Sequence, residues 1–92
     1  MRFEWDEEKN EINKQKHHIS FETAAHVFDD PYYLEMYDVE HSEDEDRYIA
    51  LGLVGEILFV VFTERKENIR LISARLATKA EQEVYYDQDI YN

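Results

Sequence analysis

The spacing of hydrophobic residues along the chain changes at Pro31 from a helical period to a strand-like one. Before this proline, apolar side chains recur at the i, i+3, i+4 and i+7 positions of one helical face: Phe21, Ala24, Ala25 and Phe28. Ser20 can cap the start of this helix. Asp29-Asp30-Pro31 should end it, because proline has no backbone donor to continue the helix. The pattern therefore predicts a helix between Ser20 and Pro31.

A more polar helix is predicted before it. Residues 2–5 resemble a short strand, and Asp6 can then cap a helix that runs to about His17. Two glutamates follow the cap, where the helix dipole favours negative charge. The apolar stripe of this helix is thin, because Ile12 is its only aliphatic residue. The stems of two cations lie on the same face: Lys9 and Lys16. We expect such a helix to pack weakly by itself.

Four strand-like segments follow Pro31, at residues 33–37, 48–54, 57–63 and 69–74. Gly55-Glu56 should make one tight turn and Glu67-Asn68 another, whereas residues 40–46 carry five acids and should form a solvated loop. The pattern predicts one antiparallel sheet ordered as in the sequence, with both helices on a single face. Residues 58–62 are apolar on both sides, so this strand should be central and covered by helices on one face. A further helix or a partner should cover the other.

A last helix is expected to begin at Thr78, because Thr78-Lys79-Ala80-Glu81 fits the capping-box pattern. Its inward side chains should be Ala80, Val84 and Tyr85, and residues 87–92 should form a frayed tail. At 92 residues, the elements make a single α+β domain over residues 1–92.

Charge narrows the candidate functions. The chain has 22 acidic and 10 basic residues, a formal net charge of −12. Four of the cations nevertheless fall between Arg65 and Arg75, which suggests a site for phosphate or carboxylate. The alternative is that these arginines pair with surplus acids on the surface.

Other classes are disfavoured by composition. The absence of cysteine excludes disulfides and thiolate metal sites. The longest apolar run, residues 57–62, is too short to span a bilayer, and the N-terminal residues do not resemble a signal peptide. We therefore expect a cytoplasmic protein that has no membrane contact.

Several motifs resemble one known family. The N-terminal part reads Trp5-Asp6-x-x-Lys9-x-x-x-Asn13-x-x-Lys16-His17-x-Ile19-Ser20-Phe21; later come Phe28-Asp29-Asp30-Pro31, Arg47, Thr63-x-Arg65 and Arg70-Leu71-Ile72-Ser73-Ala74-Arg75. Together, over residues 3–86, they closely resemble the BrnT family of bacterial toxins. The resemblance implies a fold similar to that of the RelE toxins and a metal-independent endoribonuclease activity that stops translation, with no cofactor. It also implies a BrnA-type antitoxin with a ribbon-helix-helix part, through which alone the toxin would meet DNA.

The chain departs from the family pattern in two places. His18 stands where the family usually has glycine, so a histidine must adopt the left-handed backbone expected at a helix end. The last helix tends to be basic in the family but reads Glu81-Gln82-Glu83-Val84-Tyr85-Tyr86-Asp87 here. RNA affinity comes mostly from phosphate contacts, so binding requires the few cations to converge.

Candidate residues follow from the chemistry of RNA cleavage, which without a metal needs proton-transfer groups and cations for the developing charge. We expect His17 to exchange protons and Arg65 and Arg75 to hold the phosphate as catalytic residues. An RNA-binding rim would add three cations: Lys9, Lys16 and Arg70.

Each candidate has a structural alternative. His17 could only complement the helix dipole, and the lysines could only be solvated. Arg65 or Arg75 could clamp a carboxylate such as Asp6 or Glu64, fastening a helix to the sheet. Trp5 could stack a base but more often belongs to a core. His41 lies in the acidic loop, where the spacing matches no structured metal site, and we assign it no metal.

Three functions therefore remain open at the level of sequence. The first is a ribonuclease toxin that an antitoxin neutralises. The second is a catalytically inactive, toxin-like binding module that acts within an antitoxin repressor complex. The third is an unrelated acidic adaptor.

Overall fold

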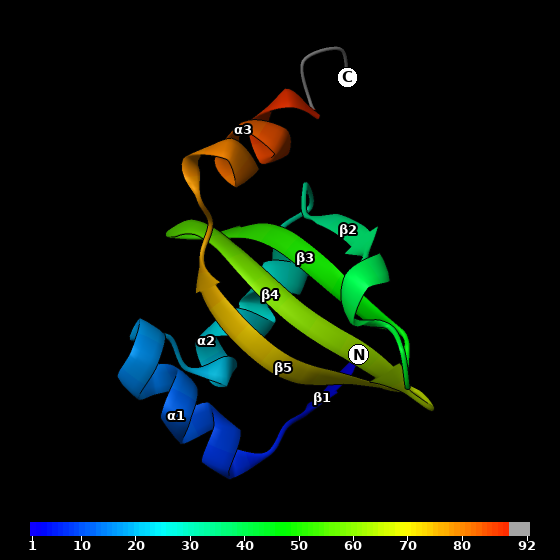
Figure 1. Cartoon of the computed structure of the whole chain (residues 1–92). Coiled ribbons are helices and arrows are strands. Elements are labelled where there is room, and N and C mark those ends of the chain that lie inside the picture. Colours follow the sequence, from blue (N-terminus) through cyan, green and yellow to red (C-terminus); the bar gives the residue numbers. More distant parts are fainter. Residues whose placement is uncertain (89–92) are drawn as a thin grey trace.

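A five-stranded sheet in the order β1-β5-β4-β3-β2 forms the centre of the molecule in the computed structural model, which describes residues 1–88 (Figure 1). Its strands are β1 (Arg2–Glu4), β2 (Leu34–Tyr37), β3 (Arg47–Val54), β4 (Glu56–Arg65) and β5 (Asn68–Leu76). The last four pair antiparallel in sequence order, as the strand period predicted. The short N-terminal strand joins the sheet as well, parallel to β5 at its edge.

One face of this sheet carries the N-terminal helical elements: α1 (Glu7–His17), α2 (Phe21–Ala24) and the 3₁₀ turn η1 (Ala25–Asp29) (Figure 1). The main core lies between them and the strands, and its largest fully buried side chains are Phe21, Val27, Val60, Phe62 and Leu71. The helix expected as one piece from Ser20 to Pro31 thus tightens into 3₁₀ geometry after Ala24. Gly52 permits the close approach of η1, because a Cβ there would lie 2.7 Å from Val27 Cβ.

Buried asparagines, and not Ile12, attach α1 to the rest of the fold. Ile12 is 54% exposed, so the predicted apolar stripe does not face the core. Asn13 donates to the carbonyls of Ile19 and Ala74, both at 2.9 Å, and accepts from the Ala74 N–H at 3.1 Å. Asn10 accepts from the Phe21 N–H at 2.8 Å. Hydrogen bonds from these amide side chains therefore attach α1 to the sheet and to α2, where a hydrophobic stripe usually would. They also give buried backbone groups their partners.

The helix ends follow the local signals. Asp6 accepts from the N–H groups of Glu8 and Lys9, and Ser20 accepts from the N–H of Thr23. His18 ends α1 with a left-handed backbone, φ 59° and ψ 28°. Histidine thus adopts the conformation that glycine usually supplies at this position.

The hairpin turns differ slightly from expectation. Gly55, with φ 72°, links β3 to β4 as predicted. The turn between β4 and β5 is Lys66-Glu67, one residue earlier than Glu67-Asn68, because Asn68 already pairs with Arg65. Lys66 adopts the positive φ of 56° that this turn requires.

The C-terminal helix α3 (Lys79–Asp87) covers one end of the other sheet face. Its capping box forms between Thr78 and Glu81 as predicted. Tyr85 alone is buried on this helix, where its hydroxyl donates to Asp30; Ala80 and Val84 are exposed, contrary to expectation. Asp87 is still helical, and the predicted tail beyond residue 88 lies outside the described residues. Within residues 1–88, no helix is long and apolar enough to cross a membrane.

Candidate functional site

The sheet face opposite α1 and α2, here called the open face, contains a groove of about 400 Å³. Its floor comes from the three central strands: Ile49, Phe59, Val61, Ile72 and Ser73. Arg75 stands on one side of the groove. On the other side the chain between β2 and β3, with its 3₁₀ turn η2 (Val39–His41), folds over the sheet and contributes Asp38, Glu40, His41 and Arg47. The groove therefore combines an apolar floor with charged walls.

Arg75 is held at the groove by contacts on two sides. Its guanidinium lies 3.8 Å from the centre of the Phe59 ring. Its two terminal nitrogens donate to the Glu81 carboxylate of α3 at 2.8 and 3.0 Å. These hydrogen bonds are the main cause that lowers the pKa of Glu81. Arg75 is thus the carboxylate clamp considered from the sequence, but its partner is Glu81 and neither Asp6 nor Glu64.

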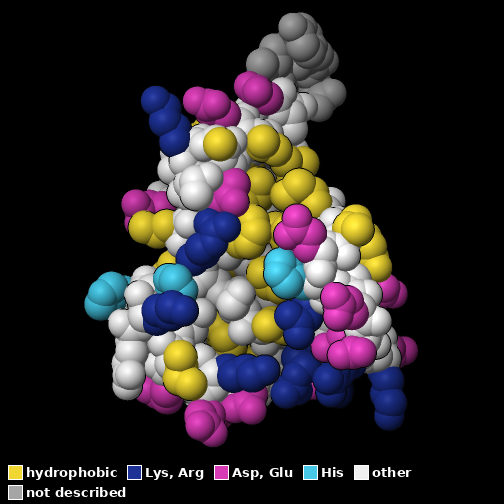
Figure 2. Space-filling model, viewed as in Figure 1, with side chains coloured by type: hydrophobic (Ala, Val, Ile, Leu, Met, Phe, Trp, Pro, Cys, Tyr) yellow, Lys and Arg dark blue, Asp and Glu magenta, His cyan; other side chains and the backbone are white. Residues whose placement is uncertain are grey.

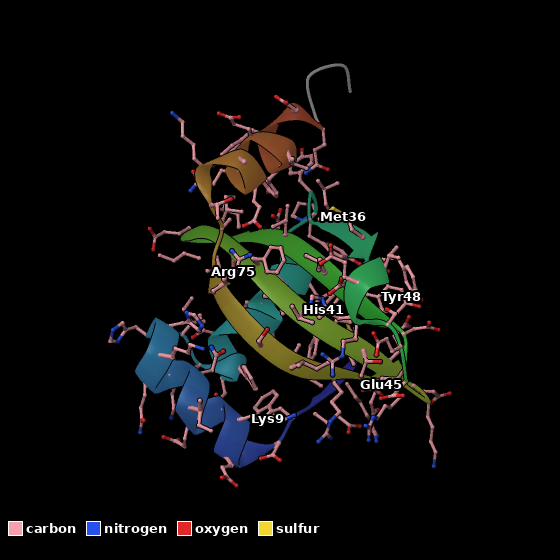
Figure 3. The ribbon with its side chains drawn as sticks, viewed as in Figure 1. Lys9, Met36, His41, Glu45, Tyr48 and Arg75 are labelled. Atoms are coloured by element: carbon pink, nitrogen blue, oxygen red, sulfur yellow. The ribbon has the colours of Figure 1, made fainter. Side chains whose placement is uncertain are left out.

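His41 and Asp38 form a hydrogen-bonded pair beside the groove. Nδ1 of His41 lies 2.9 Å from Oδ2 of Asp38, whose side chain is only 13% exposed against 62% for His41. The base of the loop is pinned, because the Asp38 N–H donates to the Arg47 carbonyl at 2.8 Å and Ser42 Oγ accepts from the Arg47 N–H at 2.9 Å. Figure 3 shows His41 and Arg75 over the same face of the sheet. These hydrogen bonds order the acidic loop as one wall of the groove, and its acids Glu40, Glu43, Asp44 and Asp46 are exposed to solvent, as the composition predicted.

Arginines gather at the end of the open face that α3 leaves free (Figure 2). The strand register places Arg47, Thr63 and Arg70 in one row across β3, β4 and β5. The next row holds Arg65 on β4, and Arg2 on β1 faces the same side. The Nε atom of Arg47 is buried and has no hydrogen-bond partner among the described residues. Arg47 as a residue lines the groove, so it adds a guanidinium to the groove wall.

Comparison with known proteins is consistent with this architecture. The sequence model of a family described as "Ribonuclease toxin, BrnT, of type II toxin-antitoxin system" matches residues 5–81. The chain belongs to the BrnT family. Its fold is also similar to the crystal structure of the Brucella abortus ribonuclease toxin BrnT, with a TM-score of 0.67 and 24% identity over 86% of this chain and 99% of that one. No curated protein sequence gave a match.

Membership in the BrnT family confirms the resemblance found in the sequence and the α+β, RelE-like fold expected from it. It also makes the chain a toxin-domain protein of a type II toxin-antitoxin system, which has an antitoxin as its partner. The reading as an unrelated acidic adaptor is therefore wrong.

The BrnT fold does not bring Arg65 and Arg75 together. Arg75 pairs with Phe59, six positions before Arg65 on β4, so the two arginines lie about 20 Å apart along the strand. Arg65 contacts Glu45 at 3.5 Å, and Arg70 contacts Glu4 at 2.7 Å. The hydrogen bonds from Asn68 and then Arg70 lower the pKa of Glu4. Each of these arginines already has a carboxylate partner.

The predicted residues of α1 do not line the groove. His17 follows Asn13 by one helical turn, so it is near the end of β5 that carries Arg75. It does not line the groove. Lys16 is exposed on the last turn, and Lys9 lies on the first turn, well away from Arg75 in Figure 3. Trp5 packs against Phe21, as a core residue does.

Sequence reasoning missed three groove residues, namely His41, Arg47 and Phe59, as parts of a site. The spacing Asp38-x-x-His41 was the available signal, because residues three apart in a helical turn face each other. The many acidic residues around this spacing made it inconspicuous in the sequence. Among the described residues, no group of three or more His, Asp or Glu side chains is arranged to hold a metal ion.

Proposed function

We propose that this chain is a metal-independent endoribonuclease that stops translation, acts in the cytoplasm, and is neutralised by a BrnA-type ribbon-helix-helix antitoxin that alone contacts DNA. Family membership supports the ribonuclease class and the antitoxin partner. The observation that carries the proposal is the groove on the open face. There Arg75 lies on the Phe59 ring, with Arg47 and His41 on the opposite wall.

The groove suits a single RNA strand chemically. A planar guanidinium fork matches the geometry of phosphate oxygens and can hold the charge that develops during cleavage. An aromatic floor offers a base a stacking partner of any sequence. In this proposal Arg75 is catalytic, and the Glu81 carboxylate stands where a phosphate would bind.

The other predicted cations take places outside the groove in this proposal. Arg65 and Arg70 extend the open face toward its arginine-rich end and would contact phosphates further along the strand. His17, Lys16 and Lys9 would form a rim beyond the edge of β5. His17 as a proton-transfer group and Arg65 as a phosphate ligand stay predictions that single substitutions test.

A second candidate function is favoured by the ion pairs. Arg65, Arg70 and Arg75 each contact a carboxylate, in a chain with a net charge of −12. A chain whose cations are neutralised in this way could act as a binding module within an antitoxin complex and cleave no RNA.

Two substitutions separate a catalytic Arg75 from a structural one. Arg75→Ala should lower the rate of RNA cleavage about 10²-fold or more, the usual loss when one stabiliser of transition-state charge is removed. Glu81→Gln breaks the same ion pair but keeps the guanidinium, so it should cleave at least as fast as the wild type. The measurement is single-turnover cleavage of a mixed-sequence transcript, with a thermal melt of each variant and a growth-arrest assay in cells.

The outcomes decide between the two functions. If both variants lose cleavage and stability together, Arg75 is only a clamp. If the wild type neither cleaves RNA nor arrests growth, the binding-module function replaces the ribonuclease. The antitoxin part fails if co-expression with the neighbouring reading frame, followed by purification through a tag on this chain, retains no partner.

A further inference from the structure

The groove contains one side chain suited to proton transfer, and the proposed function above does not use it. Arg75 and Arg47 hold charge at any ordinary pH, and the floor residues are apolar apart from Ser73. The remaining wall residues are Asp38, Glu40 and His41. Of these side-chain types, imidazole is the one that ordinarily both accepts and donates a proton near neutral pH.

The contact with Asp38 fixes the tautomer that a base needs. When a carboxylate accepts from Nδ1–H of a neutral imidazole, the lone pair remains on Nε2. Nδ1 of His41 lies 2.9 Å from Asp38 Oδ2, and the Asp38 side chain is largely buried. The neighbouring carboxylates Glu40, Glu43, Asp44 and Glu45, together with Arg47, line the loop side of His41. Asp38 is therefore the carboxylate that orients the ring, and the rest surround it.

The loop holds this pair in place. Asp38 and Arg47 are joined across the base of the loop by a backbone hydrogen bond of 2.8 Å, and Ser42 closes it with contacts to both residues. Preorganisation of this kind is what separates a catalytic group from a mobile surface histidine. Arg47 lines the same hollow as His41, so it places a cationic guanidinium next to the imidazole.

We infer that His41 is the general base of the ribonuclease, oriented by Asp38; the inference rests on the function proposed above. Nε2 takes the proton of the ribose 2′-hydroxyl while the O2′–P bond forms. The P–O5′ bond breaks, and the departing 5′ oxygen receives a proton from the imidazolium or from water. The products are a 2′,3′-cyclic phosphate and a 5′-hydroxyl, so no co-reactant is consumed.

The chain offers a matched control for this residue. His26 forms the same i,i+3 contact with Asp29, also at 2.9 Å, and its ring is 66% exposed against 62% for His41. His26 lies on η1, which packs on the sheet face opposite the groove. His26→Ala therefore removes a histidine–aspartate contact of the same spacing and length, with a carboxylate that is 78% exposed, without touching the groove.

The experiment compares the full-length wild type with His41→Ala, His41→Gln and His26→Ala. Cleavage of a mixed-sequence transcript is measured under single turnover, and binding is measured with a mixed-sequence 2′-deoxy oligonucleotide, which lacks the attacking hydroxyl. Both His41 variants should lose about 10²- to 10⁴-fold in cleavage rate while oligonucleotide affinity stays within about threefold. Added imidazole should restore part of the rate of His41→Ala, and His26→Ala should cleave like the wild type.

Two results overturn the assignment. The first is cleavage by His41→Gln within about threefold of the wild type while Arg75→Ala is inactive, since the ribonuclease then stands without His41 as its base. The second is a loss of rate that follows a matching loss of oligonucleotide affinity, with no rescue by imidazole, since His41 is then only a contact. If the wild type does not cleave at all, the proposed function and this inference fall together.

Discussion

At the scale of single residues, Asn13 is the side chain on which the packing of α1 depends most. The side-chain amide of Asn13 forms hydrogen bonds with both the N–H and the carbonyl of Ala74. Ala74 lies on a part of β5 that the short strand β1 does not reach. It thus satisfies the open edge of the sheet as another strand would. The side chain is buried, so nothing but protein can replace these bonds.

Asn13→Ala should therefore destabilise the fold by about 2–4 kcal/mol, because it leaves buried donors and acceptors of Ala74 and Ile19 unpaired. In a domain of this size, that corresponds to a fall in melting temperature of roughly 10 °C or more. Ile12→Ala, the substitution that a hydrophobic pattern would rank as worse, should cost less than about 0.5 kcal/mol because Ile12 is mostly exposed. Thermal and urea melts of the two variants check this; equal losses would contradict it.

The sequence could not reveal this role. Hydrophobic periodicity counts apolar side chains, so a helix anchored through amides looks like a helix that packs weakly. Asn13 was noticed only as part of a family motif. His41 was missed for a related reason: the position of the loop over the sheet depends on the hydrogen bonds that Asp38 and Ser42 make with Arg47, which no local pattern encodes.

At the scale of elements, α3 is fastened to the sheet at two points. Arg75 on β5 binds Glu81 near its start, and Tyr85 further along donates to Asp30. Burial by itself would raise the pKa of Asp30, but the hydrogen bonds from the Tyr85 hydroxyl and from two backbone N–H groups together lower it. Burial and this contact raise the pKa of Tyr85 above its usual value of 10.0.

The Arg75–Glu81 contact should make the stability of the fold depend on pH in the acid range. Arg75 holds the pKa of Glu81 below its ordinary 4.5. A carboxylate with a lowered pKa stabilises the fold fully above its unfolded pKa and loses that contribution as the pH falls through the folded value. Glu81→Gln should thus cost about 1 kcal/mol at pH 7, after allowance for partial exposure of the pair, and less as the pH falls below the ordinary pKa of 4.5.

Melts of the wild type and Glu81→Gln between pH 7 and pH 3 measure this difference. Glu83→Gln on the same helix is the control, because Glu83 is exposed. A gap between Glu81→Gln and the wild type that stays constant with pH would show that the ion pair contributes nothing.

Most element boundaries could be predicted because caps and turns are local. Asp6, Ser20, Thr78 and Gly55 act where the sequence indicated. The parallel pairing of β1 with β5 was not predicted, since it joins residues from opposite ends of the chain and leaves no trace in either segment. The inward face of α3 was misjudged because the helix covers only one end of the sheet, so Tyr85 suffices.

At the scale of the whole molecule, the open face carries both signs of charge in a chain whose net charge is −12. Arginines gather at one end of that face, while acids surround them and dominate the total (Figure 2). Convergence of Arg65 and Arg75 was a wrong expectation with a simple cause. Neighbouring antiparallel strands run in opposite directions, so their C-terminal ends lie at opposite ends of the pair. Two residues near the C-terminal ends of β4 and β5 are therefore far apart.

RNA binding should consequently show a modest dependence on salt. With about three to five phosphates in contact, the logarithm of the binding constant should fall with the logarithm of the salt concentration at a slope of about −2 to −3.5. Arg65→Ala and Arg70→Ala should each make the slope shallower by about 0.7, whereas Lys79→Ala on α3 should not change it. Anisotropy titrations of a 2′-deoxy oligonucleotide at several salt concentrations give the slopes. If the slope is unchanged in both arginine variants, the arginine-rich end of the open face is not part of the binding site.

The edge position of β1 also sets an order of events during synthesis. Glu4 leaves the ribosome 66 residues before its partner Arg70. At about 5–20 residues per second, this strand waits some 3–13 seconds for the strand it pairs with. The groove forms equally late in synthesis, because Phe59 and Arg75 come from the last two strands and Glu81 comes from the helix after them. A nascent chain therefore has no assembled open face until almost its whole length has been translated, and its first strand is the last to gain a neighbour.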